Sequence, residues 1–299
     1  MLNIVYSDAY DLKWAEHVFP VDKFRRVRER IIRDGIIRAD EIIPARSATE
    51  DEVLLVHQAD YYKRMWQMTD RPESGWFEFE APITKEVIEA VLCHTGGSIM
   101  ACEKAVETGG IAVSLGGGFH HAFADHGEGF CFINDIAVAV RTMLVSGKIQ
   151  RCAIIDCDLH QGNGTAKIFQ QTPEVFTFSI HQQNLYPIKQ KSDLDIGLPD
   201  FADDGEYLPH IEKHIPQILD DHRPDLVFYV AGADPYVHDT LGTLQLTREG
   251  LARRDEIIFG ESRKRNIPAV AVLAGGYATN TEDVIDIHAA MIACASRHV

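Results

Sequence analysis

Apolar residues follow two patterns along this chain: short uninterrupted runs alternate with longer segments in which apolar residues recur every three or four positions. Uninterrupted runs of strand length are typical of buried strands, and the longer spacing is typical of helices that pack on one face. The predicted strands span residues 3–6, 111–115, 152–157, 175–180, 226–231 and 269–273. The predicted helices span residues 23–34, 86–107, 134–145, 247–264 and 281–295.

This alternation favours an α/β fold in which a mostly parallel central sheet carries helices on both faces. Because no internal repeat or low-complexity linker interrupts the pattern, we expect a single domain over residues 1–299. The helix at 23–34 places Phe24, Val27 and Ile31 on one face and ends before Gly35. Residues 182–204 form the one long stretch that predicts little regular structure, and loops of that length are usually functional.

The charge balance narrows the choice of partners. The 299 residues include 29 Lys and Arg against 45 Asp and Glu, which gives a formal net charge of −16. Such an acidic surface disfavours direct binding to nucleic acid or to an anionic membrane, and it suits a cationic partner or substrate. Residues 1–6 are too short and uncharged for a signal peptide, and no apolar run reaches the roughly 18 residues of a membrane-spanning helix. We therefore expect a cytoplasmic protein.

The cysteines are scattered through apolar segments and form no Cys-x-x-Cys pair. This spacing argues against a disulfide framework and against a cysteine-based zinc site. We expect buried structural thiols at Cys93, Cys102, Cys131, Cys152, Cys157 and Cys294.

The richest polar sequence follows the predicted strand at 152–157, where Asp156, Asp158 and His160 occupy alternate positions. Side chains two residues apart on an extended backbone point the same way, so these three groups converge. Each residue also has a structural explanation, because Asp158 could cap the next helix and His160 could be a core histidine. Convergence of all three nevertheless favours a metal site.

Three other predicted strands lead into polar residues at the same edge of the sheet. Asp234 follows the strand at 226–231, Tyr277 follows the strand at 269–273, and the adjacent pair His120 and His121 follows the strand at 111–115. Ligands of parallel α/β sheets bind at the carboxyl ends of the strands. A purely structural explanation would require every one of these residues to belong to a simple turn or a helix cap, which is less favoured than a shared functional site.

The residue types indicate which ion such a site would hold. A catalytic zinc ion takes three protein ligands and keeps a further position open for water, and Asp158, His160 and Asp234 supply that set. Ferrous iron also accepts nitrogen and oxygen ligands of this kind. Asp156 is then placed to orient one of the paired histidines.

These residues and their order resemble the zinc-dependent histone deacetylases, which have the arginase/deacetylase fold. The resemblance extends from about residue 17 to residue 277, and residues 161–164 look most like class IV members. The segments that carry it are Gly118-Phe119-His120-His121, Gly129-Phe130-Cys131-Phe132-Ile133-Asn134-Asp135, residues 156–165, Gly232-Ala233-Asp234 and Gly275-Gly276-Tyr277.

The resemblance implies a role for each polar residue of the site. His120 and His121 would be the general acid and base pair, and Tyr277 would donate its hydroxyl to the developing oxyanion. Asp156 and Asn163 would orient the two histidines. The zinc ligands would be Asp158, His160 and Asp234.

A substrate tunnel and two potassium sites are also implied by the resemblance. The tunnel would be lined by Gly129, Phe130 and Tyr186. The first potassium site would comprise Asp156, Asp158, His160, Ser179 and Ile180. The second would comprise Phe169, Thr172, Val175 and Tyr207.

Two positions depart from the pattern of many family members. Asn163 replaces an aspartate, and a neutral amide orients His121 without stabilising its imidazolium, so we expect a lower pKa for that histidine. Lys23 replaces an arginine at the foot of the tunnel. It either belongs to a solvated basic helix face or helps the released acid to leave.

We expect a zinc-dependent hydrolase that removes an acetyl or longer acyl group from an N-acylated amine, above all from acyl-lysine in a protein or peptide. Alternatives are an acetylpolyamine amidohydrolase, an arginase-like hydrolase with two manganese ions, and a non-catalytic module that binds acyl-lysine. The sequence leaves the acyl length, the identity of the metal and the oligomeric state open.

Overall fold

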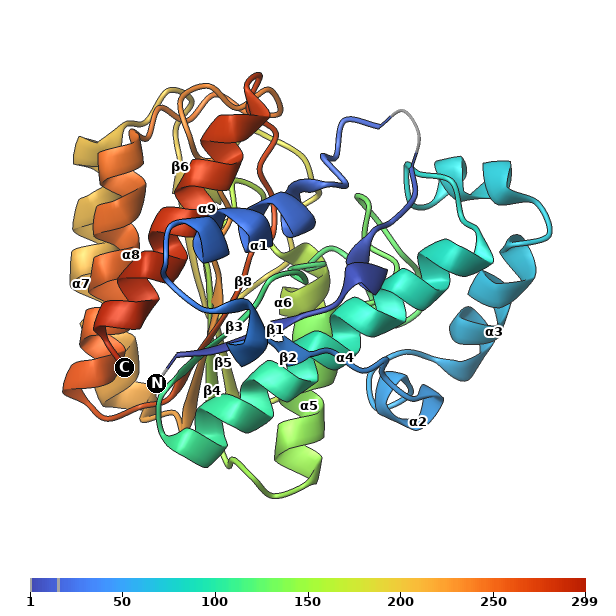
Figure 1. The fold of residues 1–299 in the computed structure, drawn as a ribbon, viewed down its shortest axis with the longest axis horizontal. Helices are drawn as coiled ribbons and strands as arrows, with labels where there is room; N and C mark the ends of the chain where they lie inside the picture. The colour runs from blue at the N-terminus through green and yellow to red at the C-terminus, as the bar shows by residue number, and fades with distance from the viewer. Residues whose placement is uncertain (1, 15–16) are drawn as a thin grey trace.

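The computed structural model describes residues 2–14 and 17–299, so residues 1, 15 and 16 of the predicted domain lie outside the described residues (Figure 1). The strands are β1 (Asn3–Tyr6), β2 (Ile43–Pro44), β3 (Ile111–Ser114), β4 (Cys152–Asp156), β5 (Val175–Gln182), β6 (Leu194–Leu198), β7 (Leu226–Val230) and β8 (Ala269–Val272). The α-helices are α1 (Lys23–Arg33), α2 (Glu50–Val53), α3 (Ala59–Met68), α4 (Lys85–Thr108), α5 (Asp135–Val145), α6 (Asn163–Phe169), α7 (Asp204–His222), α8 (Arg248–Lys264) and α9 (Thr281–Arg297).

The eight strands form one sheet in the order β2-β1-β3-β8-β7-β4-β5-β6, and every pairing is parallel. Helices α7, α8 and α9 lie on one side of this sheet, and α4, α5 and α6 lie on the other (Figure 1). The central strands β3, β4, β7 and β8 are buried along their whole length, which explains their uninterrupted apolar sequences. The predicted α/β fold with a parallel sheet and helices on both faces is therefore confirmed.

Polar side chains set where the helices begin at the carboxyl edge. The Asn134 side chain accepts a hydrogen bond from the Ala137 backbone at 2.9 Å and so starts α5, while Thr247 accepts from Gly250 at 2.9 Å and starts α8. The helix predicted to stop before Gly35 does so, with Gly35 in the left-handed region at a φ of 70°.

The prediction that residues 182–204 contain little regular structure was partly wrong, because β6 crosses this stretch as an edge strand. Its side chains alternate between partly buried and exposed, so its apolar pattern is short and weak. Helix α7 was not predicted either, because Pro209 and Pro216 lie inside it and interrupt the helical signal. The edge strand β2 and the helices α2, α3 and α6 were not predicted either.

All six cysteines are buried free thiols, as predicted. Within residues 2–14 and 17–299, no helix combines the length and the apolar character needed to cross a membrane.

Candidate active site

The loop that follows β4 gathers the charged groups at the carboxyl edge of the sheet. Asp156 ends the strand and accepts a hydrogen bond from the Asp158 backbone at 3.1 Å, and Asp158 in turn accepts from the His160 backbone at 2.9 Å. These turns of the chain hold the three side chains in place, and all three are buried. The loop therefore brings the side chains of Asp156, Asp158 and His160 together, as predicted.

Asp158, His160 and Asp234 meet at one point although Asp234 comes from the loop after β7. Their candidate ligand atoms all lie within 4.8 Å of one another, and His160 Nδ1 lies 3.2 Å from Asp158 Oδ1 and 3.4 Å from Asp234 Oδ2. Asp158 and Asp234 are further fixed by hydrogen bonds from the backbone N–H groups of Gly275 and Leu159. The sequence-predicted ligand set is thus brought together as expected.

The donor set fits a divalent cation. The Oδ2 atom of Asp234 is buried and has no hydrogen-bond partner, and burial beside the Asp158 charge raises the pKa of Asp234 to about 7. A side chain at Gly275 would fill the space in front of these oxygens, because its Cβ would lie 2.1 Å from Asp234 Oδ2 and 2.6 Å from Asp158 Oδ2. A zinc or ferrous ion would accept the unshared lone pairs of these oxygens and relieve the repulsion between the Asp158 and Asp234 carboxylates.

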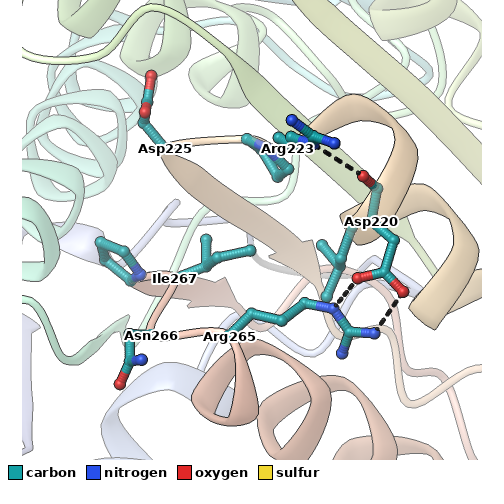
Figure 2. A pocket seen from close by; sticks show the side chains of 9 residues that line it. Asp220, Arg223, Asp225, Arg265, Asn266 and Ile267 are labelled. Carbon is teal, nitrogen blue, oxygen red and sulfur yellow. Dashed lines mark hydrogen bonds and ion pairs between the residues drawn. The ribbon is translucent and has the colours of Figure 1, made fainter.

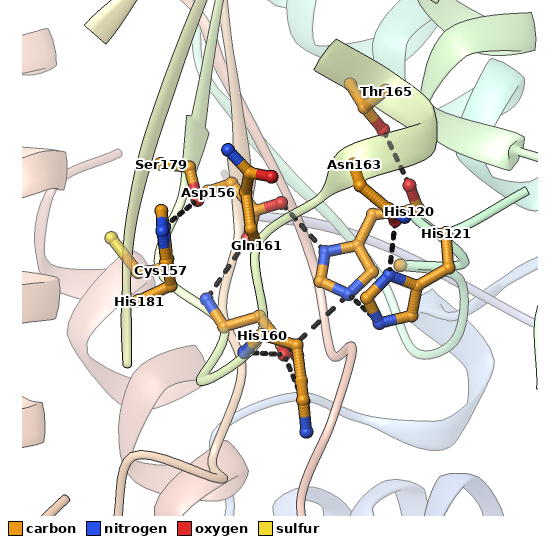
Figure 3. Close-up of polar contacts among 12 residues, drawn as sticks. His120, His121, Asp156, Cys157, His160, Gln161, Asn163, Thr165, Ser179 and His181 are labelled. Atoms are coloured by element: carbon orange, nitrogen blue, oxygen red, sulfur yellow. Dashed lines mark hydrogen bonds and ion pairs between the residues drawn. The ribbon is translucent and has the colours of Figure 1, made fainter. Parts of the chain in front are cut away.

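His120 and His121 lie beside this cluster and have different partners (Figure 3). His120 Nδ1 donates to Asp156 Oδ2 at 2.8 Å, and His121 Nδ1 donates to Asn163 Oδ1 at 2.8 Å. The two Nε2 atoms are 3.1 Å apart. Asp156 therefore contacts one of the paired histidines and Asn163 contacts His121, as predicted.

The two histidines also differ in protonation. Burial lowers the pKa of His120, but the charges of Asp156 and Asp158 outweigh this effect and raise it to about 9. Burial, followed by the positive charge of His120 and His160, holds the pKa of His121 well below its usual range. The surroundings therefore favour the charged form of His120 and the neutral form of His121.

The loop that carries the two histidines is held by residues whose role the sequence did not reveal. The Asp135 carboxylate accepts hydrogen bonds from the backbone N–H groups of Gly118 and Phe119, at 3.0 and 2.8 Å. His94 of α4 accepts one from Gly117 at 3.1 Å. Asp135 lies in a segment that carries the family resemblance, but His94 has no sequence signal because it reaches the loop only through the fold.

A tunnel leads from the surface to the histidines. Its cavity of about 280 Å³ is lined by Glu80, His121, Gly129, Phe130, His160, Leu185, Tyr186, Leu241 and Tyr277. The structure thus places Gly129, Phe130, Tyr186 and Tyr277 where the resemblance implies. The Asp239 carboxylate accepts a hydrogen bond from the Tyr277 backbone N–H at 2.7 Å and so holds the backbone of Tyr277 in place.

At the inner end of the tunnel, a foot of only about 20 Å³ lies beside Asp158, His160 and the two histidines and is closed by the glycines of the histidine loop, Phe19, Phe119 and Ala274. Gly117 and Gly118 have φ values of 75° and 93°, and a Cβ at Gly118 would lie 2.5 Å from the backbone of Ala274. Only glycine allows this close approach.

Lys23 lies near the foot and not on a solvated face. Its side chain is fully buried, and its Nζ atom donates to the carbonyl oxygen of Ala274 and lies 4.5 Å from the centre of the Phe19 ring. Burial lowers the pKa of Lys23 to about 8. The basic-face interpretation is therefore wrong for Lys23, although Arg25 on the same helix is exposed.

The first set of proposed potassium ligands is brought together. Asp156 on β4 lies directly opposite Ser179 on β5, and Ile180 is the next residue on that strand. Ser179 also lies 2.9 Å from His181 Nδ1 (Figure 3). The binding of potassium here stays a prediction.

The second set is not brought together. Phe169, Thr172 and Val175 share a turn in which Thr172 and Val175 each donate to the carbonyl three residues before, at 2.9 Å. Val175 pairs with Cys152 at the start of β4, whereas Tyr207 packs near Cys157, just past the end of that strand. Five strand residues span about 16 Å, so Tyr207 cannot share a site with the turn.

A larger groove, of about 630 Å³, lies at the opposite edge of the sheet, where β7 and β8 begin (Figure 2). Its principal cation, Arg265, is already paired with Asp220 through two hydrogen bonds of 2.7 and 2.8 Å. Its charged groups therefore neutralise each other, and the reactive groups remain at the carboxyl edge.

Comparison with known proteins agrees with this geometry. The profile of the histone deacetylase domain matches residues 17–292. An uncharacterized protein of Picosynechococcus is 40% identical over 274 residues, which are 91% of each chain. Histone deacetylase 2 of Arabidopsis thaliana is 29% identical over 298 residues, covering 95% of this chain and 76% of that one.

Solved structures show the same fold. The crystal structure of an HDAC homolog complexed with SAHA has a TM-score of 0.84 at 23% identity and covers 99% of this chain and 84% of its own. The structure of the HDA15 HD domain has a TM-score of 0.83 at 23% identity, with 97% and 90% covered. The closer likeness to class IV stays a prediction. On the match over residues 17–292, the chain belongs to the histone deacetylase family.

Proposed function

We propose that this chain is a zinc-dependent deacylase that removes a short acyl group from the side chain of lysine. One observation carries the proposal: a buried set of two carboxylates and an imidazole faces two histidines of opposite charge preference at the foot of an apolar tunnel. Such a site can activate water and accept its proton at the same point.

Asp158, His160 and Asp234 would hold the metal ion. When bound, zinc polarises the amide carbonyl and lowers the pKa of a water molecule from 15.7 towards about 7. Their burial keeps bulk water away, which strengthens every electrostatic interaction in the site.

His121 is the proton acceptor in this proposal. Asn163 holds the Nδ1–H of His121, and Glu128 accepts from the Asn163 amide nitrogen at 3.2 Å, which fixes the amide orientation. The Nε2 lone pair of neutral His121 therefore takes the proton of the attacking water. The same proton passes to the lysine nitrogen as the amide C–N bond breaks, and a carboxylic acid and a free amine result.

His120 and Tyr277 stabilise the charge that develops during this step. His120 stays positive because Asp156 holds its Nδ1–H, so it offers a fixed charge beside the reacting carbon. Tyr277 lines both the tunnel and its foot, and its hydroxyl is the donor for the developing oxyanion.

The tunnel walls suit the alkyl stem of an acylated amine. Phe130, Leu185 and Leu241 present apolar surface to the substrate, which suits the four methylene groups of lysine. Acetylputrescine has four methylene groups as well, and it carries one free ammonium group, for which Glu80 is the one carboxylate among the lining residues.

The small foot favours a short acyl group. The cavity of about 20 Å³ beside the proposed metal ligands is closed by Phe19 and Phe119, so a long chain would have to displace one of these rings. We therefore propose acetyl as the preferred group.

A hydrolysis panel on the purified protein tests the proposal. Acetyl-lysine peptide, long-chain acyl-lysine peptide and acetylputrescine are each incubated with and without a zinc chelator. We expect chelator-sensitive release, fastest from acetyl-lysine. Faster release from acetylputrescine or from the long-chain peptide would overturn the substrate assignment. No release from any of the three substrates, with one equivalent of zinc bound, would favour a binding module.

A further inference from the structure

A second group of metal-ligand side chains lies where α9 ends against α8, away from the candidate active site. Glu256 comes from α8, Cys294 from the last turns of α9, and His298 follows the end of that helix. Helix α9 begins at Thr281, close after Tyr277, and Cys294 lies thirteen residues further on, about 20 Å along the axis. The two sites are therefore separate.

The three side chains already have a geometry that suits a small cation. Glu256 Oε2 lies 3.3 Å from Cys294 Sγ, and Glu256 Oε1 lies 2.9 Å from His298 Nε2. All candidate ligand atoms lie within 4.8 Å of one another. Zinc bonds of about 2.0–2.3 Å place neighbouring ligand atoms about 3.3–3.8 Å apart. Cys294 lies in the last turns of α9 and His298 is the residue directly after Arg297, so both belong to the same end of the helix.

Solvent can reach this cluster. A groove of about 550 Å³ between α7, α8 and the chain end is lined by both Glu256 and His298, while Cys294 is buried and contacts Glu256. Arg297 pairs with Glu256 at 3.2 Å, but its side chain is 62% exposed and can turn into water. Exposed ion pairs of this kind contribute little, so Arg297 does not block the site.

We propose that Glu256, Cys294 and His298 form a second transition-metal site that takes zinc, with water in the fourth position. On binding, the Cys294 thiol loses its proton to solvent and its sulfur becomes a thiolate ligand. The ion then joins the end of α9 to α8. This site is independent of the proposed deacylase function, because none of its ligands contributes to the tunnel or the catalytic cluster.

Cobalt(II) distinguishes the two sites, because only a thiolate ligand gives a sulfur-to-cobalt charge-transfer band and the catalytic ligands are oxygen and nitrogen. Metal-free full-length protein is titrated with Co²⁺. We expect about two equivalents to bind, with a charge-transfer band from the second site. Cys294→Ser should lose the band and one equivalent but keep its hydrolytic activity, while His298→Gln should weaken the second site at least about tenfold.

Cys131→Ser is the matched control, because Cys131 is a buried thiol at the foot of the active site, and it should keep the band. Glu256→Gln provides a further variant at a partly exposed position if Cys294→Ser fails to fold. Binding of one equivalent without a charge-transfer band would overturn the proposal. So would a band that survives in Cys294→Ser or that disappears in Cys131→Ser.

Discussion

The Nδ1 atom of His121 lies 2.8 Å from the Oδ1 atom of Asn163, whereas the neighbouring His120 faces a carboxylate at the same distance. Adjacent histidines thus have partners of different charge. Burial, followed by the neighbouring His120 and His160, lowers the pKa of His121, and a neutral amide opposes this less than a carboxylate would, so His121 is suited to accept a proton. This difference between the two histidines fixes the direction of the pH shift in the first prediction.

Asn163→Asp should move the acidic limb of the kcat/KM profile to higher pH. A carboxylate stabilises the imidazolium of His121 and raises its pKa, so the base is lost earlier on acidification, by about one pH unit or more. The profile is measured between pH 5 and 9.

Glu128 complicates this substitution because it would face the new carboxylate, so the double variant Asn163→Asp with Glu128→Gln restores an amide opposite it. Asn163→Ala removes the acceptor and should lower kcat without an upward shift of the limb. An acidic limb that stays in place in both aspartate variants would contradict the assignment of His121 as the base.

Gln161 connects the metal-ligand loop to the loop that carries Tyr186. Its side chain donates to the Gln190 carbonyl at 2.6 Å, accepts from the Gln190 backbone at 2.8 Å and also donates to Asp195 at 2.6 Å. Gln161→Ala should loosen this tunnel wall and raise KM about tenfold, with kcat and zinc content nearly unchanged. The surface variant Gln170→Ala is the control, and a loss confined to kcat would argue against a positioning role.

The central strands and the position of the site were predictable because both depend on local sequence. Buried parallel strands read as uninterrupted apolar runs, and Asp156, Asp158 and His160 lie within five residues of one another. Their partner Asp234 was found because its strand ends at the same edge of the sheet. Metal-ligand and catalytic residues that lie at strand ends can thus be predicted from the sequence alone.

The supporting contacts were not predictable, because they depend on tertiary packing. His94 lies in the middle of α4, and nothing in its sequence surroundings indicates that it reaches Gly117. Tyr207 was assigned to a potassium site across a segment in which β6 was missed, and the unpredicted α7 carries it to the other end of β4. Lys23 resembles its basic neighbours in sequence, and only burial distinguishes it.

Tyr277→Phe should lower kcat about a hundredfold or more while zinc binding is retained. The hydroxyl contributes a hydrogen bond to the oxyanion that forms only in the transition state, and such a bond is typically worth about 3–4 kcal/mol. Steady-state kinetics and metal analysis measure both effects. Tyr186→Phe, on the opposite tunnel wall, should change kcat only a few-fold, and wild-type turnover in Tyr277→Phe would remove this hydroxyl from the mechanism.

Asp234→Ala should lose both the zinc ion and activity, because two remaining ligands cannot hold the ion tightly. Asp156→Asn is the matched control, since Asp156 orients His120 and does not belong to the proposed ligand set. It should keep its zinc and lose part of kcat. Metal content is measured on purified variants, with Cys294→Ser present in both to exclude the second site, and a full zinc complement in Asp234→Ala would refute the ligand assignment.

Acid should destabilise the fold in part through His94. This histidine is fully buried, accepts from Gly117 at Nδ1 and donates to the Tyr10 carbonyl from Nε2 at 2.9 Å, so it must be neutral in the folded protein. Burial lowers its pKa to about 3.

The unfolded chain protonates His94 near pH 6.5, so stability is complete above that pH and falls as the pH drops from about 6.5 towards 3. Between pH 7 and 5, this histidine alone should cost about 2 kcal/mol of unfolding free energy. His94→Gln, measured by urea unfolding at both pH values, should lose that part of the pH dependence. The surface substitution His126→Gln controls for the exchange itself, and parallel pH curves for wild type and His94→Gln would show that His94 is not the group that titrates.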